Sequence, residues 1–127
     1  MPEYYGVAAV RHFSDAEALA GIESWDGAGH LIGFSAECSI KHGISTLRPD
    51  AESVRKHIPD LTDVAKRLLN QRRHTGIYIV LKNANFMAGW SVESRYSNDG
   101  AVDKEVYMLW RQQAYSLLHA ANLRAKK

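Results

Sequence analysis

The clearest hydrophobic pattern in the chain lies within residues 60–73. Apolar residues recur there at every third and fourth position, which is the spacing of one face of an α-helix. They are Leu61, Val64, Ala65, Leu68 and Leu69. Residues 3–22 show a looser version of the same spacing, which fits either one long helix or two half-helices. Residues 103–124 predict a last helix with a core stripe of Val106, Trp110, Ala114, Leu117 and Ala121.

Short polar residues stand where helices are expected to begin. Ser14 and Glu17 have the spacing of a capping box. Asp26 is placed to cap a helix over residues 25–42, and Asp103 to cap the last helix. A further short helical piece is expected over residues 50–57, where Pro59 stops it.

Residues 77–81, Ile-Tyr-Ile-Val-Leu, leave two interpretations open. β-Branched and aromatic residues favour a strand, whereas a short apolar run is equally compatible with a buried helix. A strand here would pair with residues 90–96 through the loop between them. The sequence therefore predicts an all-α, antiparallel bundle of four to five helices forming one domain over residues 1–127, with a small hairpin around residues 76–96 as the alternative.

A stripe of three polar side chains runs along the otherwise apolar helix predicted over residues 25–42. At about 100° per residue, Glu37 and Lys41 each fall within about 20° of His30 around the helix axis. The other sides of this helix carry Ala28, Leu31, Ile32, Ala36, Cys38 and Ile40. Because a surface helix normally has a wide polar face, most of this helix must be packed against protein. We therefore expect either a functional site or a buried polar network here.

The composition narrows the class of protein. A net charge of +2, from 16 Lys and Arg against 14 Asp and Glu, is too weak to indicate nucleic-acid binding by itself. A hydrophobic fraction of 46% suffices for a core without disulfides. The single cysteine, Cys38, lies in an apolar helix, where it is expected to act as a small hydrophobic residue in a reducing compartment. No signal-peptide pattern and no apolar run of about 20 residues is present, so the expected location is the cytoplasm and no membrane contact is expected.

Several short motifs in this order resemble the HEPN superfamily of small all-α domains, in particular its short bacterial members. The matching pieces span most of the chain. They are Asp15-Ala16, residues 30–38 with Lys41, residues 57–61, Trp90, and Arg95-Tyr96. The helix that carries Glu37-Cys38 is the most specific of these pieces.

The resemblance implies an antiparallel helical bundle that forms a homodimer, in a superfamily where many members are metal-independent RNA endonucleases. Other members bind nucleotides or proteins, and such domains are frequent in toxin–antitoxin pairs, commonly beside a nucleotidyltransferase, and in defence against phage. The ribonuclease members carry an arginine followed after four to six residues by a histidine. That motif is absent here, because the next histidine after Arg95 is His119, and Arg111 stands eight residues before it, about 12 Å along a helix.

RNA cleavage without a metal requires a base for the ribose 2′-hydroxyl, a cation for the phosphate and an acid for the leaving oxygen. The candidate catalytic residues are Arg95, as the phosphate-binding cation, with Glu37 and Lys41. The candidate RNA- or nucleotide-binding residues are Tyr96, which can stack on a base, and His30, Arg111 and His119. No cofactor is expected, and the six histidines and one cysteine show no metal-ligand spacing.

Two functions from different classes remain open. The first is a metal-independent RNA endonuclease of a toxin–antitoxin or phage-defence system. The second is a non-catalytic binding or assembly module that partners itself, a nucleotidyltransferase-type antitoxin or another protein through exposed aromatic residues and the last helix. In the second case, Glu37 and Lys41 form a structural ion pair and Arg95 pairs with a carboxylate.

Overall fold

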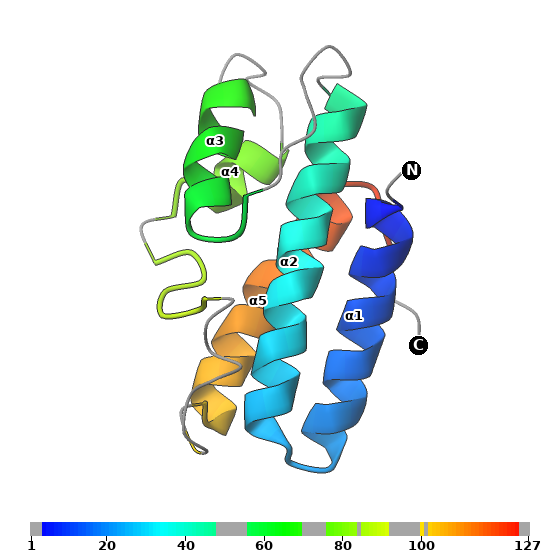
Figure 1. Cartoon of the computed structure of the whole chain (residues 1–127), viewed down its shortest axis with the longest axis vertical. Coiled ribbons are helices and arrows are strands. Elements are labelled where there is room, and N and C mark those ends of the chain that lie inside the picture. Colours follow the sequence, from blue (N-terminus) through cyan, green and yellow to red (C-terminus); the bar gives the residue numbers. More distant parts are fainter. Residues whose placement is uncertain are drawn as a thin grey trace.

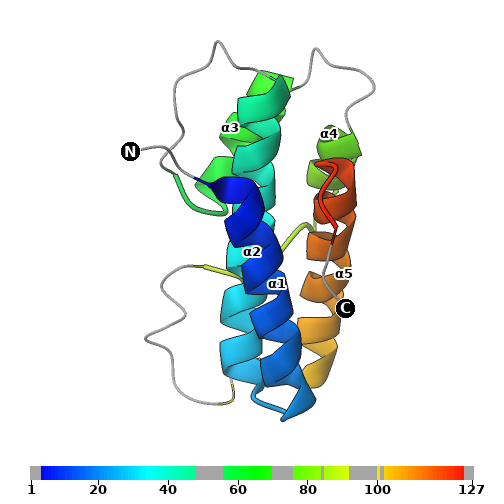
Figure 2. The ribbon, with the colours of Figure 1, turned by 90° about the vertical axis from the view of Figure 1, so that its right-hand side faces the viewer.

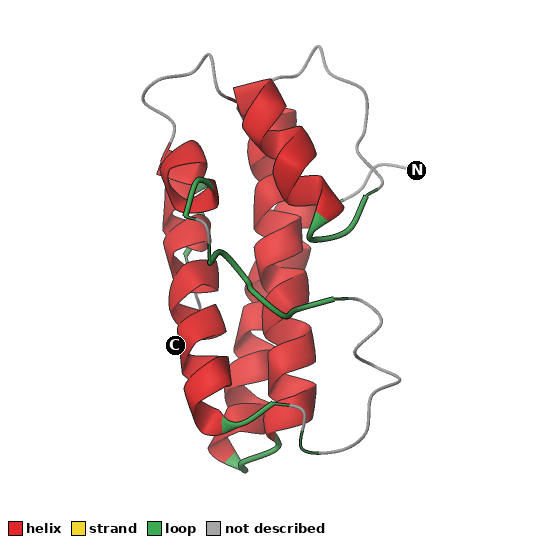
Figure 3. Ribbon diagram, turned by 90° about the vertical axis from the view of Figure 1, so that its left-hand side faces the viewer, coloured by secondary structure: helices red, strands yellow, loops and turns green. Residues whose placement is uncertain are grey.

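The protein is described from a computed structural model, which covers residues 4–47, 56–69, 76–83, 85–91, 100 and 102–124. Within these residues the chain forms helices and no strand (Figure 3). In chain order the helices are α1 (Tyr5–Gly21), α2 (Trp25–Leu47), α3 (Asp60–Leu69), α4 (Gly76–Leu81) and α5 (Lys104–Ala120). The predicted all-α helical bundle is confirmed.

The longest helix, α2, is the centre of the bundle. It packs along α1 on one side and along α5 on the other, while α3 packs against its C-terminal half (Figure 1). The short α4 contacts both α3 and α5. α1 runs antiparallel to both α2 and α5, which point in the same direction (Figures 1 and 2). α2 therefore ends where α3 and α4 lie, and α5 begins at the opposite end of the bundle.

The periodic apolar residues of the sequence form the core. In α3, Leu61, Ala65 and Leu69 are fully buried, and in α5 the same holds for Ala114 and Leu117. Burial of this apolar surface is the main stabilising contribution to the bundle. α3 ends at Leu69 within the described residues, and the predicted continuation to residue 73 lies outside them.

The strand interpretation of residues 77–81 is wrong, because this segment forms α4. Ile77 and Leu81, one helical turn apart, are buried, whereas Ile79 is 56% exposed. In a strand, residues 77, 79 and 81 would share one face, so this burial pattern is that of a helix. One face of the helix packs against α3 and α5, and these contacts stabilise it, whereas an isolated hairpin would have no such packing. The hairpin alternative therefore fails on its first strand, and most of the second, residues 92–96, lies outside the described residues.

Two of the predicted helix starts are also corrected. α1 is one continuous helix, so Ser14 and Glu17 lie inside it and do not begin a second helix. Asp26 lies within the first turn of α2, and its carboxylate accepts hydrogen bonds from the backbone N–H groups of Gly100 at 2.7 Å and Val102 at 2.9 Å. Asp26 thus ties the residues before α5 to α2.

The remaining predicted helix starts have different outcomes. The cap of α5 is confirmed, since Oδ1 of Asp103 accepts from the N–H of Val106 at 2.9 Å. Lys56 and His57 are not helical, so the helix expected over residues 50–57 does not include its last two residues. Residues 50–55 lie outside the described part of the chain.

Two glycines let bulky side chains approach the backbone of α2. A Cβ at Gly33 would overlap the ring of Trp90, and one at Gly43 would overlap the side chain of Ile77. Nε1 of Trp90 donates a hydrogen bond to the carbonyl oxygen of Gly29 at 3.0 Å. The indole therefore lies in a slot on α2 that exists because residue 33 has no side chain.

Candidate functional site

A buried carboxylate, Glu37, is the centre of the polar stripe on α2. Its side chain is 5% exposed, and that of Lys41, one turn further along, is 10% exposed. Nζ of Lys41 lies 3.6 Å from Oε2 of Glu37 and 5.5 Å from the ring centre of Tyr5 on α1. The structure thus brings together the two candidate catalytic residues of this helix, as a buried ion pair at i and i+4.

His57, in the segment before α3, binds the same carboxylate. Its Nδ1 lies 3.0 Å from both oxygens of Glu37, and the backbone N–H of Ile58 donates to Oε1 at 3.3 Å. Because a carboxylate only accepts hydrogen bonds, Nδ1 carries the donated proton. The imidazole is 50% exposed, so Glu37 holds a ring that solvent can reach.

Sequence reasoning did not assign His57 a role. The only signal was its place at the start of the segment 57–61 in the HEPN resemblance. Its contact with Glu37 spans 20 positions of the chain and joins a helix to a non-helical segment, so no periodic pattern connects them.

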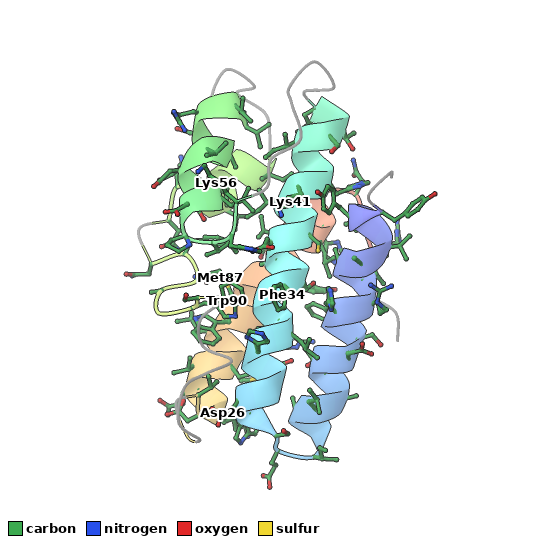
Figure 4. The ribbon with its side chains drawn as sticks, viewed as in Figure 1. Asp26, Phe34, Lys41, Lys56, Met87 and Trp90 are labelled. Atoms are coloured by element: carbon green, nitrogen blue, oxygen red, sulfur yellow. The ribbon has the colours of Figure 1, made fainter. Side chains whose placement is uncertain are left out.

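His30 belongs to a cluster of rings. Its ring centre lies 4.8 Å from that of Phe34, in an edge-on arrangement, and 6.0 Å from that of Trp90. Phe34 and Trp90 also meet edge-on at 5.6 Å. Figure 4 shows Phe34 and Lys41 on the same face of α2, with Trp90 reaching that face from the neighbouring segment. His30 therefore shares the stripe of Glu37 while its ring packs against aromatic side chains.

His12 on α1 adds a fourth ring to this face, with its centre 5.8 Å from that of Phe34. Burial lowers the pKa of His12 below its ordinary value of 6.5, and nearby Arg11 adds to this effect. The charges that oppose it are those of Asp15 and Glu37. The folded chain therefore protonates His12 less readily than the unfolded chain does.

This difference predicts a pH dependence of stability. The contribution of neutral His12 is fully present above pH 6.5 and is lost as the pH falls below that value through the folded-state pKa. We expect urea unfolding to show a lower free energy at about pH 5.5 than at about pH 7.5, and a weaker dependence in His12→Gln. An identical dependence in both proteins would contradict the assignment to His12.

Arg111 and His119 share one face of α5, as the sequence predicts, and that face meets α1. Nε of Arg111 donates to Oε1 of Glu17, and the guanidinium lies 5.4 Å from the ring centre of Phe13. The ring of His119 lies 4.5 Å from that of Tyr115. Arg111 is thus engaged in joining α5 to α1.

The hydroxyl of Tyr107 also donates to Glu17, at 2.8 Å from Oε2. Burial, together with this hydrogen bond, raises the pKa of Tyr107 well above its ordinary value. The phenol therefore stays protonated and keeps its hydrogen bond throughout the physiological pH range.

Arg95 and Tyr96 lie outside the described residues. The structure therefore places Glu37, Lys41, His30, Arg111 and His119, and it brings only Glu37 and Lys41 into direct contact among them. Among the described residues, no group of three or more His, Cys, Asp and Glu side chains is arranged to hold a metal ion.

A groove of about 630 Å³ opens between the N-terminal half of α1, His42 of α2 and the residues that follow α5. Its lining includes the apolar residues Val7, Val10 and Leu123 and the charged residues Arg11, Asp15 and Arg124. Such a volume is large enough to accept side chains of a partner protein or a small ligand.

No protein-family model matches the chain, and neither a curated protein nor a solved structure matches it. None of the helices in the described ranges has the length and apolar composition needed to cross a membrane.

Proposed function

We propose that the protein is a non-catalytic helical module that binds and assembles with other protein chains. The observation that carries this proposal is the outer face of α1, where large apolar side chains lie in solvent. At the start of α1, Tyr4 is 71% and Val7 63% exposed, and Val7 also lines the groove. Ile22, just after the other end of α1, is 74% exposed, and Ile79 of α4 and Met108, Leu109 and Tyr115 of α5 are exposed as well. Neighbouring exposed apolar residues beside a groove are typical of protein interfaces.

The surroundings of the candidate catalytic groups support the same proposal. The carboxylate of Glu37 is occupied by His57, Ile58 and Lys41, and it joins α2 to the segment before α3. A general base needs a free lone pair directed at its substrate, whereas this carboxylate is buried and directed at donors of its own chain. The polar stripe therefore acts as an internal connection between helices.

The biological setting that we propose follows the HEPN resemblance. The module would serve a toxin–antitoxin or phage-defence system, as a homodimer and beside a nucleotidyltransferase-type antitoxin or another protein. A groove lined by both apolar and charged residues suits a protein partner.

Light scattering coupled to size exclusion tests the proposal, on the protein alone and together with the products of neighbouring genes. We expect a complex larger than the 14.2 kDa chain and no turnover of RNA by that complex. A protein that stays monomeric in every mixture while it cleaves RNA would overturn the proposal.

RNA cleavage is the second candidate function, and one observation favours it. The half-exposed imidazole of His57 is oriented by a buried carboxylate that binds its Nδ1. Nε2, the ring nitrogen that does not bind Glu37, is the one that would contact a substrate. A histidine held in this way can act as a general base on a ribose 2′-hydroxyl. In this hypothesis Glu37 positions the base, and Arg95 remains the proposed cation for the phosphate.

The RNA hypothesis predicts that His57→Gln and Arg95→Ala each reduce cleavage of a structured RNA by at least about 100-fold. Lys82→Ala removes an exposed cation near the end of α4 and is the control, with unchanged cleavage. The measurement is a single-turnover assay with end-labelled RNA in the presence of a metal chelator. Cleavage that survives both substitutions comes from another site or a contaminant.

A further inference from the structure

Six exposed residues form a continuous stripe along the outer side of α1. They are spaced by three or four positions, and they lie within roughly 80° of one another around the helix axis. The stripe, called here the outer stripe, consists of Tyr4, Val7, Arg11, Asp15, Ala18 and Ile22. Its two ends are apolar and its middle carries one cation and one anion.

None of the described elements covers the outer stripe. α1 lies at the edge of the bundle in Figure 1 and in front of α2 in Figure 2. Within the part of the chain that the structure describes, neither Arg11 nor Asp15 takes part in an ion pair. Among the described residues, neither charge is therefore neutralised by an ion pair.

The charges of the outer stripe are complementary to those of a second outer stripe that runs in the opposite direction. When two copies of α1 are laid antiparallel with Arg11 of one opposite Asp15 of the other, Asp15 of the first is also opposite Arg11 of the second. The same alignment places Tyr4 opposite Ile22 at both ends. A parallel alignment would instead oppose each charge to itself, with repulsion at both positions.

We propose that the outer stripe binds the outer stripe of a second copy of this chain, antiparallel across a twofold axis. This inference rests on the proposed assembly function and assigns the surface through which two copies bind. A twofold axis makes every contact occur twice, so the two Arg11–Asp15 pairs lie at the centre and the apolar residues enclose them. The groove beside Val7 and Arg11 extends this surface toward the end of α5.

The contact is small. α1 has 17 residues and is therefore roughly 25 Å long, so one helix pair with its flanks lies at the low end of specific interface sizes. We accordingly expect a monomer–dimer equilibrium that depends on protein concentration in the micromolar range, on the order of 1–100 μM.

Charge reversal tests both the surface and its direction. Arg11→Asp places an aspartate opposite Asp15 of the second copy, and Asp15→Arg places two arginines opposite one another. We expect each single variant to weaken the dimer at least about tenfold. The double variant Arg11→Asp/Asp15→Arg restores antiparallel pairing and should dimerise like the wild type. Under parallel pairing each residue is opposite its own copy, so the single variants oppose like charges just as the wild type does and would not weaken the dimer.

An equimolar mixture of the two single variants gives an independent check. One variant carries two acidic groups at the centre of its stripe and the other two basic groups, so the mixture should form a heterodimer while each variant alone stays monomeric. Sedimentation velocity over a range of concentrations, with one variant fluorescently labelled, measures this. Lys82→Asp, the same charge change on an exposed residue near α4, is the control and should leave the dimer unchanged.

The outcomes separate this inference from the proposed function. Both substituted residues are exposed, so thermal unfolding of the single variants should match that of the wild type. A wild-type chain that stays monomeric up to about 1 mM, or a dimer that neither charge reversal weakens, overturns the outer-stripe dimer. If a complex with the product of a neighbouring gene still forms in that case, the assembly function stands without the homodimer.

Discussion

Replacing Trp90 with alanine is expected to lower the free energy of unfolding by about 3–5 kcal/mol, the largest effect of any single apolar substitution that we predict. The indole is 3% exposed, lies in the slot at Gly33 and donates to the carbonyl oxygen of Gly29. Its removal opens a cavity along α2 and removes the hydrogen bond from the indole to that carbonyl oxygen. Chemical denaturation followed by far-UV circular dichroism measures the loss.

Gly33→Ala probes the same slot from the other side. The added methyl group would clash with the ring of Trp90, so we expect a loss of about 1–3 kcal/mol in the wild-type background. In the Trp90→Ala background the clash is gone, and the same change should have little effect. Gly21→Ala is the matched control, because a Cβ at Gly21 meets no atom within 4 Å. Additive losses at Gly33 and Trp90 would show that the two do not share one slot.

The slot illustrates which parts of the fold the sequence could predict. Helical periodicity is local, so it predicts α3 and α5 with their buried stripes and identifies Asp103 as a cap. The pairing of Trp90 with Gly33 joins positions 57 residues apart, and nothing in either local pattern names the other. The same limit applies to residues 77–81, whose composition left helix and strand open, because the contacts of α4 with α3 and α5 that stabilise a helix there come from distant segments.

The candidate site shows a similar division. Glu37 and Lys41 are one helical turn apart, so the sequence alone placed them in contact. His30 has the same direction around α2, but it stands seven residues, or roughly 10 Å, from Glu37 along the axis. A projection down the helix axis shows the angle between two residues around the axis but not their separation along it. His30 therefore packs on Phe34 and Trp90, while His57, from another segment, binds Glu37.

Replacing Glu37 with alanine is expected to lower the free energy of unfolding by about 3–5 kcal/mol, although the residue is charged and lies in a helix. The variant leaves the ammonium group of Lys41, 10% exposed, without its counter-charge, and the N–H of Ile58 without its acceptor. His57 is half-exposed and can bind water in place of the carboxylate, so the loss comes mainly from Lys41 and Ile58. Urea denaturation at neutral pH measures it.

Two further variants test whether the loss of stability comes from an unpaired charge and from the burial of the carboxylate. In Glu37→Ala/Lys41→Met the unpaired ammonium is gone while an apolar side chain still reaches toward Tyr5, so the double variant should be more stable than Glu37→Ala alone. Glu17→Ala is the matched control, since Glu17 also holds two partners but its side chain is 36% exposed, and its loss should be roughly 1 kcal/mol. Equal losses for Glu17→Ala and Glu37→Ala would mean that burial does not set the energy of the Glu37 cluster. The interpretation of that cluster as an internal connection, rather than a group held ready for a substrate, would then fail.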